Sequence, residues 1–255
     1  MSGEFTGQVA IVTGGSSGIG QSVAEALARA GAQVAVVASA SLEKAAEVCR
    51  GIEAEGGSAR PYVADVRDPE ALAHLVTEVE SDFGAVGLLV NGAGVFVATP
   101  AGATDQGAAE RMIDTNLLGA WNAVSAVLPS MRRRGGGRIV NFSSTAATIG
   151  VRQFSLYCAS KAAVSMMTRA LAAELAAEGI AINAIAPGNT ATPMNATVRA
   201  DAEALDAMRR ITPSGVAFSD ADRIAGIVLF LLSDRASPVH GATWLADEGI
   251  SAAIG

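Results

Sequence analysis

Short apolar runs rich in valine, isoleucine and alanine alternate with longer stretches of alanine, leucine and glutamate almost to the C-terminus of this 255-residue chain. The short runs are typical of strands, and several are apolar at every position, as buried parallel strands are. The predicted strands are Val9–Thr13, Gln33–Ala38, Ala59–Ala64, Gly87–Val90, Gly137–Phe142, Ile180–Ile185 and Ala242–Ala246. The longer stretches carry apolar residues three and four positions apart, which predicts helices over Ile19–Ala30, Leu42–Glu55, Pro69–Phe83, Gln106–Arg133, Ser155–Ala177 and Asp220–Leu232.

This alternation predicts an α/β fold, a single-domain Rossmann-type doubly wound parallel sheet of about seven strands with helices on both faces. No proline- or serine-rich linker and no break in composition divides residues 1–255, which are therefore expected to form one domain. Ligands of such a sheet bind at the carboxyl ends of its strands. Residues 189–213 are the one long stretch without a predicted strand, and we expect them to form a lid over that edge.

Charge and targeting signals limit the expected partners. The chain has 18 basic and 25 acidic residues, and a net charge of −7 disfavours binding to nucleic acid through its phosphates. The cluster Arg132–Arg134 is expected to be the solvated end of a helix, where the dipole favours cations. The N-terminus lacks a signal sequence, and no apolar run is long enough to span a membrane. With two cysteines, which suit a reducing compartment, we expect a soluble cytoplasmic protein with no membrane partner.

Histidines and cysteines are too few and too scattered to predict a metal site. His74 and His240 are the only histidines, and neither lies near a cysteine pair with zinc-ligand spacing. A Ser-His-Asp triad would have to use one of these two residues, which disfavours that chemistry. We expect His74 on a polar helix face, His240 in a surface loop, and Cys49 and Cys158 as inert thiols.

A glycine-rich turn follows the first predicted strand and opens a helix, in the sequence Thr13-Gly14-Gly15-Ser16-Ser17-Gly18-Ile19-Gly20. Gly14 permits a tight turn, Gly18 lets the backbone approach a pyrophosphate, and Gly20 allows the helix to pack against the sheet. A glycine-rich loop by itself also fits a purely structural turn. Here it joins a strand to a helix, which is the context that a dinucleotide-binding motif requires. No lysine follows the loop, which disfavours an ATP-binding P-loop.

The end of the second predicted strand bears on the choice of dinucleotide. A carboxylate there would bind the ribose 2′-hydroxyl of NAD, and a nearby arginine would accommodate the 2′-phosphate of NADP. The sequence has Ala38 and Ser39 and offers neither group. Because Ala38 removes the charge that would repel a phosphate, and Ser39 or Ser41 could donate hydrogen bonds to one, we expect a weak preference for NADP(H) with some use of NAD(H).

Tyr157 and Lys161 are four residues apart, which places them on one face of a helix, one turn from each other. A neighbouring ammonium favours the phenolate and would bring the tyrosine pKa towards the working range of an acid/base catalyst. Ser144 lies at the end of the fifth predicted strand, where its hydroxyl could hydrogen-bond a substrate carbonyl. The spacing of tyrosine and lysine is common by chance, but its coincidence with the glycine turn and the serine favours a proton-transfer site.

These motifs resemble those of the short-chain dehydrogenase/reductase family, in the family's order and from Val9 to about Gly249. The glycine turn comes first, and Asp65-Val66 follows the third strand. The family's N-N-A-G motif appears after the fourth strand, with Gly92 in place of its second asparagine. Asn116 belongs to an Asn-x-x-Gly motif; then Ser144, Tyr157 and Lys161 fall at the catalytic positions. The segment that begins Pro187-Gly188 and contains Thr192 resembles the part of the family that holds the nicotinamide.

The resemblance implies a role for each catalytic position. Tyr157 would be the general acid in carbonyl reduction and the base in alcohol oxidation, and Ser144 would polarise the carbonyl. Lys161 would bind the nicotinamide ribose and lower the pKa of Tyr157, while Asn116 would hold a water that passes protons. The implied cofactor contacts are Gly14, Ser16, Ser17, Gly18, Ile19, Ser39, Asp65, Val66, Asn91, Ala93, Gly94, Tyr157, Lys161, Pro187, Gly188, Thr190 and Thr192.

The resemblance also implies a homotetramer and a small-molecule substrate. Alanine-, leucine- and methionine-rich faces of the predicted helices Gln106–Arg133 and Ser155–Ala177 are the expected subunit contacts. The expected reaction transfers a hydride between a nicotinamide cofactor and a carbonyl or secondary alcohol. Oxoacyl thioesters, polyols or sugars, and cyclic alcohols all remain open as substrates. The alternative is a dinucleotide-binding regulator or scaffold without catalysis, and a methyltransferase is disfavoured because it has no use for the tyrosine and lysine.

Overall fold

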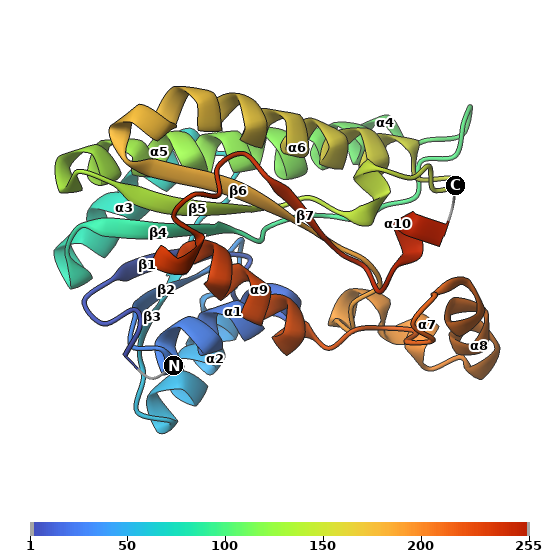
Figure 1. Cartoon of the computed structure of the whole chain (residues 1–255), viewed down its shortest axis with the longest axis horizontal. Helices are drawn as coiled ribbons and strands as arrows, with labels where there is room; N and C mark the ends of the chain where they lie inside the picture. The colour runs from blue at the N-terminus through green and yellow to red at the C-terminus, as the bar shows by residue number, and fades with distance from the viewer. Residues whose placement is uncertain (1–2, 254–255) are drawn as a thin grey trace.

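Seven parallel strands form one sheet in the order β3-β2-β1-β4-β5-β6-β7 (Figure 1). The computed structural model describes residues 3–253. Its single parallel sheet confirms the predicted doubly wound α/β fold. The strands are β1 (Val9–Thr13), β2 (Gln33–Ala38), β3 (Ser58–Val63), β4 (Val86–Asn91), β5 (Gly137–Phe142), β6 (Ile180–Pro187) and β7 (Thr243–Ala246).

Helices cover both faces of the sheet because successive strand residues point to opposite faces and the residues on both faces are apolar. From β1, Ala10 and Val12 pack into one hydrophobic core, and Val9 and Ile11 pack into the other. The first core includes α1 (Gly18–Arg29), α2 (Leu42–Ala54) and α9 (Ala221–Leu232). The second includes α3 (Pro69–Phe83), α5 (Gly119–Arg134) and α6 (Ser155–Leu175). Figure 1 shows α5 and α6 above the sheet and α1 and α9 below it.

The predicted single helix over Gln106–Arg133 is wrong, because the segment is broken in the middle. It forms α4 (Gln106–Ile113), a π-helical turn (Asp114–Leu118) and then α5. In the turn, the backbone N–H of Gly119 donates to the carbonyl of Asp114, five residues back rather than four. The turn contains the buried Asn116, whose side chain bonds the backbone of Val95. The apolar spacing runs through this break and gave no sign of it.

The predicted lid contains helices as well as loop. A single turn of 3₁₀ helix over Pro193–Asn195 precedes α7 (Ala196–Arg199) and α8 (Ala202–Ile211). Figure 1 shows α7 and α8 projecting from the body of the sheet, at the same end as the short helix α10 (Ile250–Ala253). No residue of α8 is buried, so this helix has few contacts to hold it in place.

The close approach of α1 to the glycine turn predicts a position-specific effect of adding a methyl group. A Cβ at Gly20 would collide with the Gly14 carbonyl oxygen, whereas a Cβ at Gly226, in the interior of α9, meets no atom within 4 Å. We expect Gly20→Ala to lower the free energy of unfolding by about 1–3 kcal/mol. Gly226→Ala should raise it by about 0.5–1 kcal/mol, because alanine favours the helix. Urea unfolding followed by circular dichroism measures both changes, and equal effects would contradict the packing described here.

Candidate active site

The carboxyl ends of the central strands bring together residues that are far apart in the sequence. Gly94, after β4, lies beside both Asn116 and Lys161: a Cβ built on it would be 3.3 Å from Asn116 Oδ1 and 3.6 Å from Lys161 Nζ. A Cβ on Gly18, in the glycine turn, would be 3.2 Å from Thr192 Cγ2. The sheet edge thus joins the motifs that the sequence predicted as one site.

Tyr157 lies in the first turn of α6, close enough to the hydroxyl of Ser144 for that hydroxyl to lower its pKa. Ser144 is itself fixed as the cap of a 3₁₀ turn that follows β5, where its Oγ accepts a hydrogen bond of 3.2 Å from the Ala146 N–H. Burial raises the pKa of Tyr157, and the Ser144 hydroxyl opposes this change. The phenol is therefore protonated at neutral pH.

Lys161 is buried one helical turn beyond Tyr157, with 6% of its surface exposed. Its Nζ donates a hydrogen bond of 2.8 Å to the Phe142 carbonyl and lies 5.9 Å from the centre of the Tyr157 ring. Burial lowers the pKa of Lys161 to about 8, because the interior disfavours the ammonium. Burial is the largest influence on both groups, so the pKa of Tyr157 is raised in the free chain, and the expectation that Lys161 lowers it stays a prediction.

Asn116 joins the π-helical turn to the loop after β4. Its Oδ1 accepts a hydrogen bond of 2.8 Å from the Val95 N–H, and its Nδ2 donates one of 3.0 Å to the Val95 carbonyl. Its Nδ2 also donates to Ser160 Oγ at 3.3 Å, on the helix that carries Tyr157 and Lys161. The side chain thereby fixes the position of α6 relative to Gly94, which faces both Asn116 and Lys161.

The glycine turn leaves the start of α1 suited to an anion. Gly14 and Gly18 both have left-handed backbone conformations, with φ of +67° and +56°. Ser17 caps α1 without a side-chain hydrogen bond, and the first turn of the helix carries no acidic residue. A helix N-terminus of this kind favours a phosphate. Together with the close approach at Gly94, this fits a dinucleotide laid across the strand ends.

The residues predicted to contact the adenosine half lie at the ends of β2 and β3. Ala38 is buried and Ser39 is exposed at the end of β2. Asp65 follows β3, and hydrogen bonds from Arg67 hold the pKa of its carboxyl below the usual range. The sequence prediction missed Lys44, an exposed cation in the first turn of α2, whose backbone N–H donates to Ser41 Oγ.

Asn91 has a structural position that the sequence did not predict. It is buried, and its Nδ2 donates to Asn141 Oδ1 at 2.8 Å and to the Ala120 carbonyl at 3.2 Å. Asn141 in turn donates to Thr168 at 2.9 Å, so the amides link β4, β5 and α6. The Asn91 Oδ1 is buried without a hydrogen-bond partner in the structure. The side chain thus serves the packing of the site, and its backbone is the part that lies at the strand end.

The first part of the predicted lid, directly after β6, is held by two residues that the sequence analysis did not single out, Asn195 and Arg199. The Asn195 Nδ2 donates to the Thr190 carbonyl at 2.6 Å, and its Oδ1 accepts from the Thr192 N–H at 3.2 Å. Arg199 donates to Asn195 Oδ1 at 2.9 Å and to the Thr192 carbonyl at 3.1 Å. Thr192 and Asn195 form a capping box at the start of the 3₁₀ turn, a local pattern that could have revealed this pair in the sequence.

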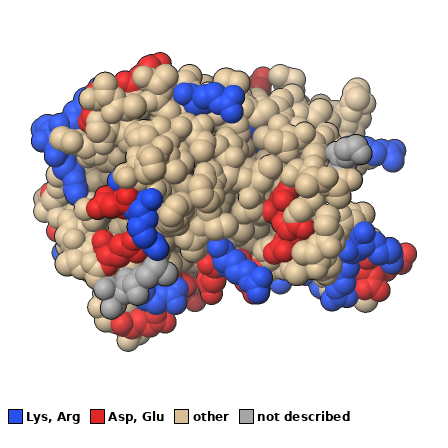
Figure 2. Space-filling view, viewed as in Figure 1, with Lys and Arg blue, Asp and Glu red and all other residues tan. Residues whose placement is uncertain are grey.

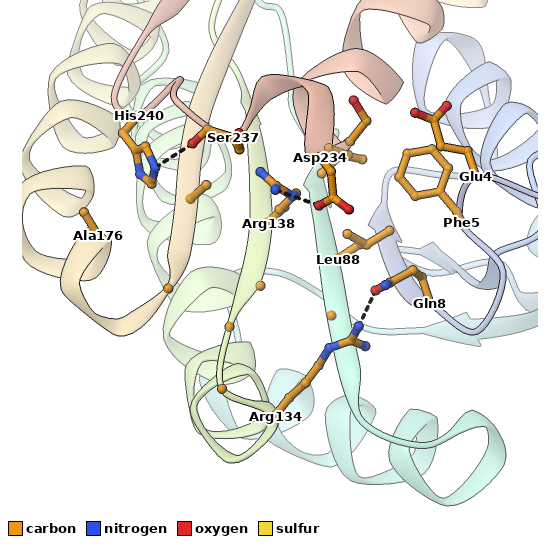
Figure 3. Close-up of a pocket in the computed structure, with 18 residues that line it drawn as sticks. Glu4, Phe5, Gln8, Leu88, Arg134, Arg138, Ala176, Asp234, Ser237 and His240 are labelled. Atoms are coloured by element: carbon orange, nitrogen blue, oxygen red, sulfur yellow. Dashed lines mark hydrogen bonds and ion pairs between the residues drawn. The ribbon is translucent and has the colours of Figure 1, made fainter. Parts of the chain in front are cut away.

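A separate cavity of about 530 Å³ lies at the opposite edge of the sheet, at the amino ends of the strands (Figure 3). The basic residues around it are already bonded: Arg134 donates to Gln8 at 2.6 Å, and Arg138 pairs with Asp234 at 2.9 Å. His240 is exposed, and its Nε2 lies at a hydrogen-bonding distance of 3.2 Å from the Ser237 carbonyl oxygen. The cavity shares no residue with the predicted site.

The other sequence predictions on polar residues can be placed as well. The cluster Arg132–Arg134 ends α5, where Arg132 pairs with Glu178 and Arg133 with Glu80, as expected for a solvated helix end. Across residues 3–253, no group of three or more histidine, cysteine or acidic side chains could hold a metal ion. Within the same range, no helix is both long enough and apolar enough to cross a membrane.

The buried amine predicts a stability effect that depends on pH. The unfolded chain keeps the ordinary lysine pKa of 10.5, and the folded chain lowers it to about 8, so the folded chain binds fewer protons between these values. Stability therefore rises with pH across this window. Removing the charge with Lys161→Met should stabilise the free chain at pH 7 by up to about 3 kcal/mol, less about 1 kcal/mol for the lost hydrogen bond. The gain should disappear by pH 10.5.

Urea unfolding at both pH values measures this difference. Lys44→Met is the matched control, because Lys44 is the only other lysine and is exposed. Its substitution should leave the free energy of unfolding nearly unchanged at both pH values. A Lys161 variant that is less stable than the parent at pH 7 would contradict the cost assigned to the buried ammonium.

Comparison with known proteins agrees with this geometry. The sequence model described as short chain dehydrogenase matches residues 8–203. The chain is 37% identical to 3beta-hydroxysteroid dehydrogenase 1 of Eggerthella lenta, over 97% of this chain and 95% of that protein. It is 38% identical to cyclohexanol dehydrogenase of Acinetobacter sp., over 97% and 96%. A gluconate 5-dehydrogenase of Burkholderia cenocepacia, in complex with NADP and tartrate, superposes with a TM-score of 0.92 at 33% identity, over 98% of this chain and 97% of that one.

Both the sequence and the structural likeness extend over nearly the whole chain, and they agree with the converging motifs at the sheet edge. The chain therefore belongs to the short-chain dehydrogenase family, and it is an oxidoreductase that transfers a hydride between a nicotinamide cofactor and a carbonyl or secondary alcohol.

Proposed function

We propose that Tyr157 is the acid/base catalyst of this oxidoreductase and that Ser144 positions the substrate oxygen beside it. The nearness of the two hydroxyls carries the proposal: Ser144 is close enough to lower the pKa of Tyr157, so that a single substrate oxygen could accept from both. In reduction, the Tyr157 hydroxyl gives its proton to the carbonyl oxygen as the carbon receives a hydride. In oxidation, the phenolate takes the proton back. The nicotinamide supplies or accepts the hydride when it is bound.

Lys161 and Asn116 would support the proton transfer by connecting Tyr157 with solvent. The Lys161 amine is buried beside Gly94, at a position that can donate to ribose hydroxyls, and its lowered pKa makes the proton easy to release. Asn116 holds the backbone of Val95 and the helix that carries both catalytic groups. In the proposed path a water held near Asn116 connects Lys161 with solvent.

The alternative, a silent dinucleotide-binding regulator, has less support. A protein that only binds a dinucleotide needs neither a buried lysine amine nor a tyrosine beside a serine hydroxyl. Burying the amine disfavours its charged form and therefore costs stability at neutral pH. Such a cost is expected where a group performs chemistry.

For the cofactor, we propose binding along the glycine turn and the ends of β4 and β6, with a modest preference for NADP(H). The buried Ala38 has no carboxylate to repel a 2′-phosphate, while Ser39 and Ser41 could donate to one. Lys44, in the first turn of α2, adds a cation close to them in the sequence. The structurally similar gluconate 5-dehydrogenase was crystallised with NADP, which supports this direction.

The proposed lid over residues 189–213 would close on the bound molecules from α7 and α8. Within it, Asn195 and Arg199 bond the backbone of Thr192, which faces Gly18 of the glycine turn. Movement of the lid would thus change the position of Thr192 at the nicotinamide end of the site. We also propose that residues 1–255 act as one dinucleotide-binding domain, and that the protein works in the cytoplasm on a small-molecule substrate.

A homotetramer is the proposed assembly, and we expect light scattering at micromolar concentration to give a mass of four chains. Large apolar side chains are exposed on the predicted contact helices, namely Trp121 on α5, with 47% exposure, and Met166 on α6, with 60%. The edge strand β7 exposes Trp244 and Leu245, and Figure 2 shows few charged side chains at the centre of the face that contains it. Such surfaces favour burial between subunits. A monomer mass would refute the proposal.

Substitution of the catalytic phenol tests the proposed chemistry. We expect Tyr157→Phe to reduce kcat by roughly a hundredfold or more, because it removes the proton-transferring hydroxyl and little volume. Affinity for the cofactor should stay within a few fold, as measured by quenching of protein fluorescence. Tyr62→Phe is the matched control, since Tyr62 is the only other tyrosine and hydrogen-bonds Asp82 from the edge strand β3, away from the predicted catalytic site. Comparable losses in the two variants would refute the role of Tyr157.

The raised pKa of Tyr157 also determines how the rates of reduction and oxidation change with pH. The protonated phenol needed for reduction is already present at neutral pH, whereas the phenolate needed for oxidation forms only as the pH rises. We expect kcat/KM for alcohol oxidation to increase from pH 7 into the alkaline range, and that for ketone reduction to stay level near neutral pH and to fall only as the pH approaches the raised pKa. Steady-state rates in both directions measure this, and parallel profiles would contradict the assignment.

A carboxylate at the end of β2 tests the cofactor proposal. We expect Ala38→Asp to shift the ratio of kcat/KM values from NADP(H) towards NAD(H) by at least about tenfold, because the new charge repels a 2′-phosphate and accepts ribose hydroxyls. Glu43→Gln, which changes an exposed charge in α2, serves as a control for a general change in local charge. A parent protein that prefers NAD(H) by about a hundredfold, or 2.7 kcal/mol, would overturn the proposed preference.

A further inference from the structure

Two stacked phenylalanine rings lie next to the proposed catalytic tyrosine, one of them in contact with its ring, and neither has a part in the proton transfer. The Phe96 and Phe154 rings are stacked, with centres 4.2 Å apart and planes within 6° of each other. Phe96 also meets the Tyr157 ring edge-on, with centres 4.7 Å apart. Phe96 nevertheless has 43% of its surface exposed. The result is an aromatic wall, made of Phe96 and Phe154, beside the Tyr157 ring.

The backbone fixes the aromatic wall at some cost. Thr99 and Phe154 form an isolated parallel bridge, and the Thr99 N–H donates to the Gln153 carbonyl at 2.6 Å. The Thr99 hydroxyl accepts a hydrogen bond from the Leu156 N–H at 3.3 Å, at the start of α6. Gln153 takes a left-handed conformation with φ of +68°, which L side chains rarely adopt. Strain of this kind is usually retained at functional sites.

The segments that surround the catalytic residues are almost without charge. They are residues 93–104 after β4, 144–157 between β5 and the start of α6, and 189–198 of the lid, and Arg152 is their only charged residue. Arg152 itself is exposed. Arg199, the first charge beyond them in the lid, is bonded to Asn195 and Thr192. Large apolar side chains are exposed on all three segments, including Val151, Met194 and Val198.

This lining has consequences for the substrate. A carboxylate or a phosphate on the substrate would lose its hydration here without gaining a dedicated cation, and this loss would weaken binding. A polyol would bring several hydroxyls against aromatic rings that cannot accept or donate ordinary hydrogen bonds. A saturated ring can instead lay its C–H groups on the aromatic face and remove apolar surface from water.

We propose that the aromatic wall selects uncharged cyclic secondary alcohols and the corresponding ketones as substrates. The inference rests on the proposed role of Tyr157 and names the substrate class of the same site. In oxidation, the carbinol C–H bond breaks and its electron pair leaves with the hydrogen to the oxidised nicotinamide. The O–H proton passes to the Tyr157 phenolate, and the C=O bond of the cyclic ketone forms. The reduction runs the same steps in reverse.

Matched alcohols test the class directly. trans-4-Methylcyclohexanol and trans-4-hydroxycyclohexanecarboxylate share the ring and the reacting group and differ in charge, and hexan-2-ol and a six-carbon polyol lack the ring. We expect kcat/KM for the neutral ring to exceed that for each of the other three compounds by at least about tenfold. Equal or higher values for the carboxylate, the open chain or the polyol would overturn the inference and leave the role of Tyr157 intact. No turnover of any of the alcohols, with either cofactor, would overturn both.

Variants of the wall separate recognition from mere support of Tyr157. Phe96→Ala should raise KM for the neutral ring by roughly tenfold while kcat changes only a few fold, and Phe96→Leu should give a smaller increase. KM for hexan-2-ol should change much less. Phe83→Ala is the control for loss of an aromatic side chain, because Phe83 ends α3 and packs under Arg60, away from these segments. A uniform fall in kcat for all the alcohols, with KM unchanged, would show a supporting role and overturn the inference.

Discussion

Parallel pairing of all seven strands is the constraint on which the rest of the structure depends. Two parallel neighbours cannot be joined by a tight turn, so each connection returns along a face of the sheet before the next strand begins. Every segment that leaves a strand therefore starts at the same edge. The glycine turn after β1, Gly94 after β4, Ser144 after β5 and Thr192 after β6 meet there for this reason.

At that edge the interior acts on the two titrating groups in opposite directions. Burial disfavours the charge on Lys161 and lowers its pKa, and it disfavours the phenolate of Tyr157 and raises the other pKa. Both side chains are thus biased towards their neutral forms in the free chain. The Ser144 hydroxyl lowers the pKa of Tyr157, and Lys161 donates a hydrogen bond to the Phe142 carbonyl, and both limit what this burial costs. The site combines a stability cost with groups whose protons can be moved.

The proposed specificity depends on a different set of contacts from the proposed chemistry. The proposed catalytic residues come from the turn after β5, the π-helical turn and α6, while the aromatic wall joins the loop after β4 to the loop before α6. One bridge, at Thr99 and Phe154, holds these two loops together. A change in these loops can therefore alter the substrate while the hydroxyls and the amine stay in place, which suits a fold that serves many substrates.

The sequence by itself determined the order of strands and helices, the glycine turn, and the spacing that puts Tyr157 and Lys161 on one helix face, because these follow from local periodicity and backbone freedom. Only the tertiary structure decided the π-helical turn at Asn116, since its bonding partner Val95 lies on another loop. The same holds for the unpaired carbonyl of the Asn91 side chain, the stacking of Phe96 on Phe154, and the raised pKa of Tyr157. These features depend on which distant segments meet and on how much water they exclude, and the spacing of neighbouring residues determines neither.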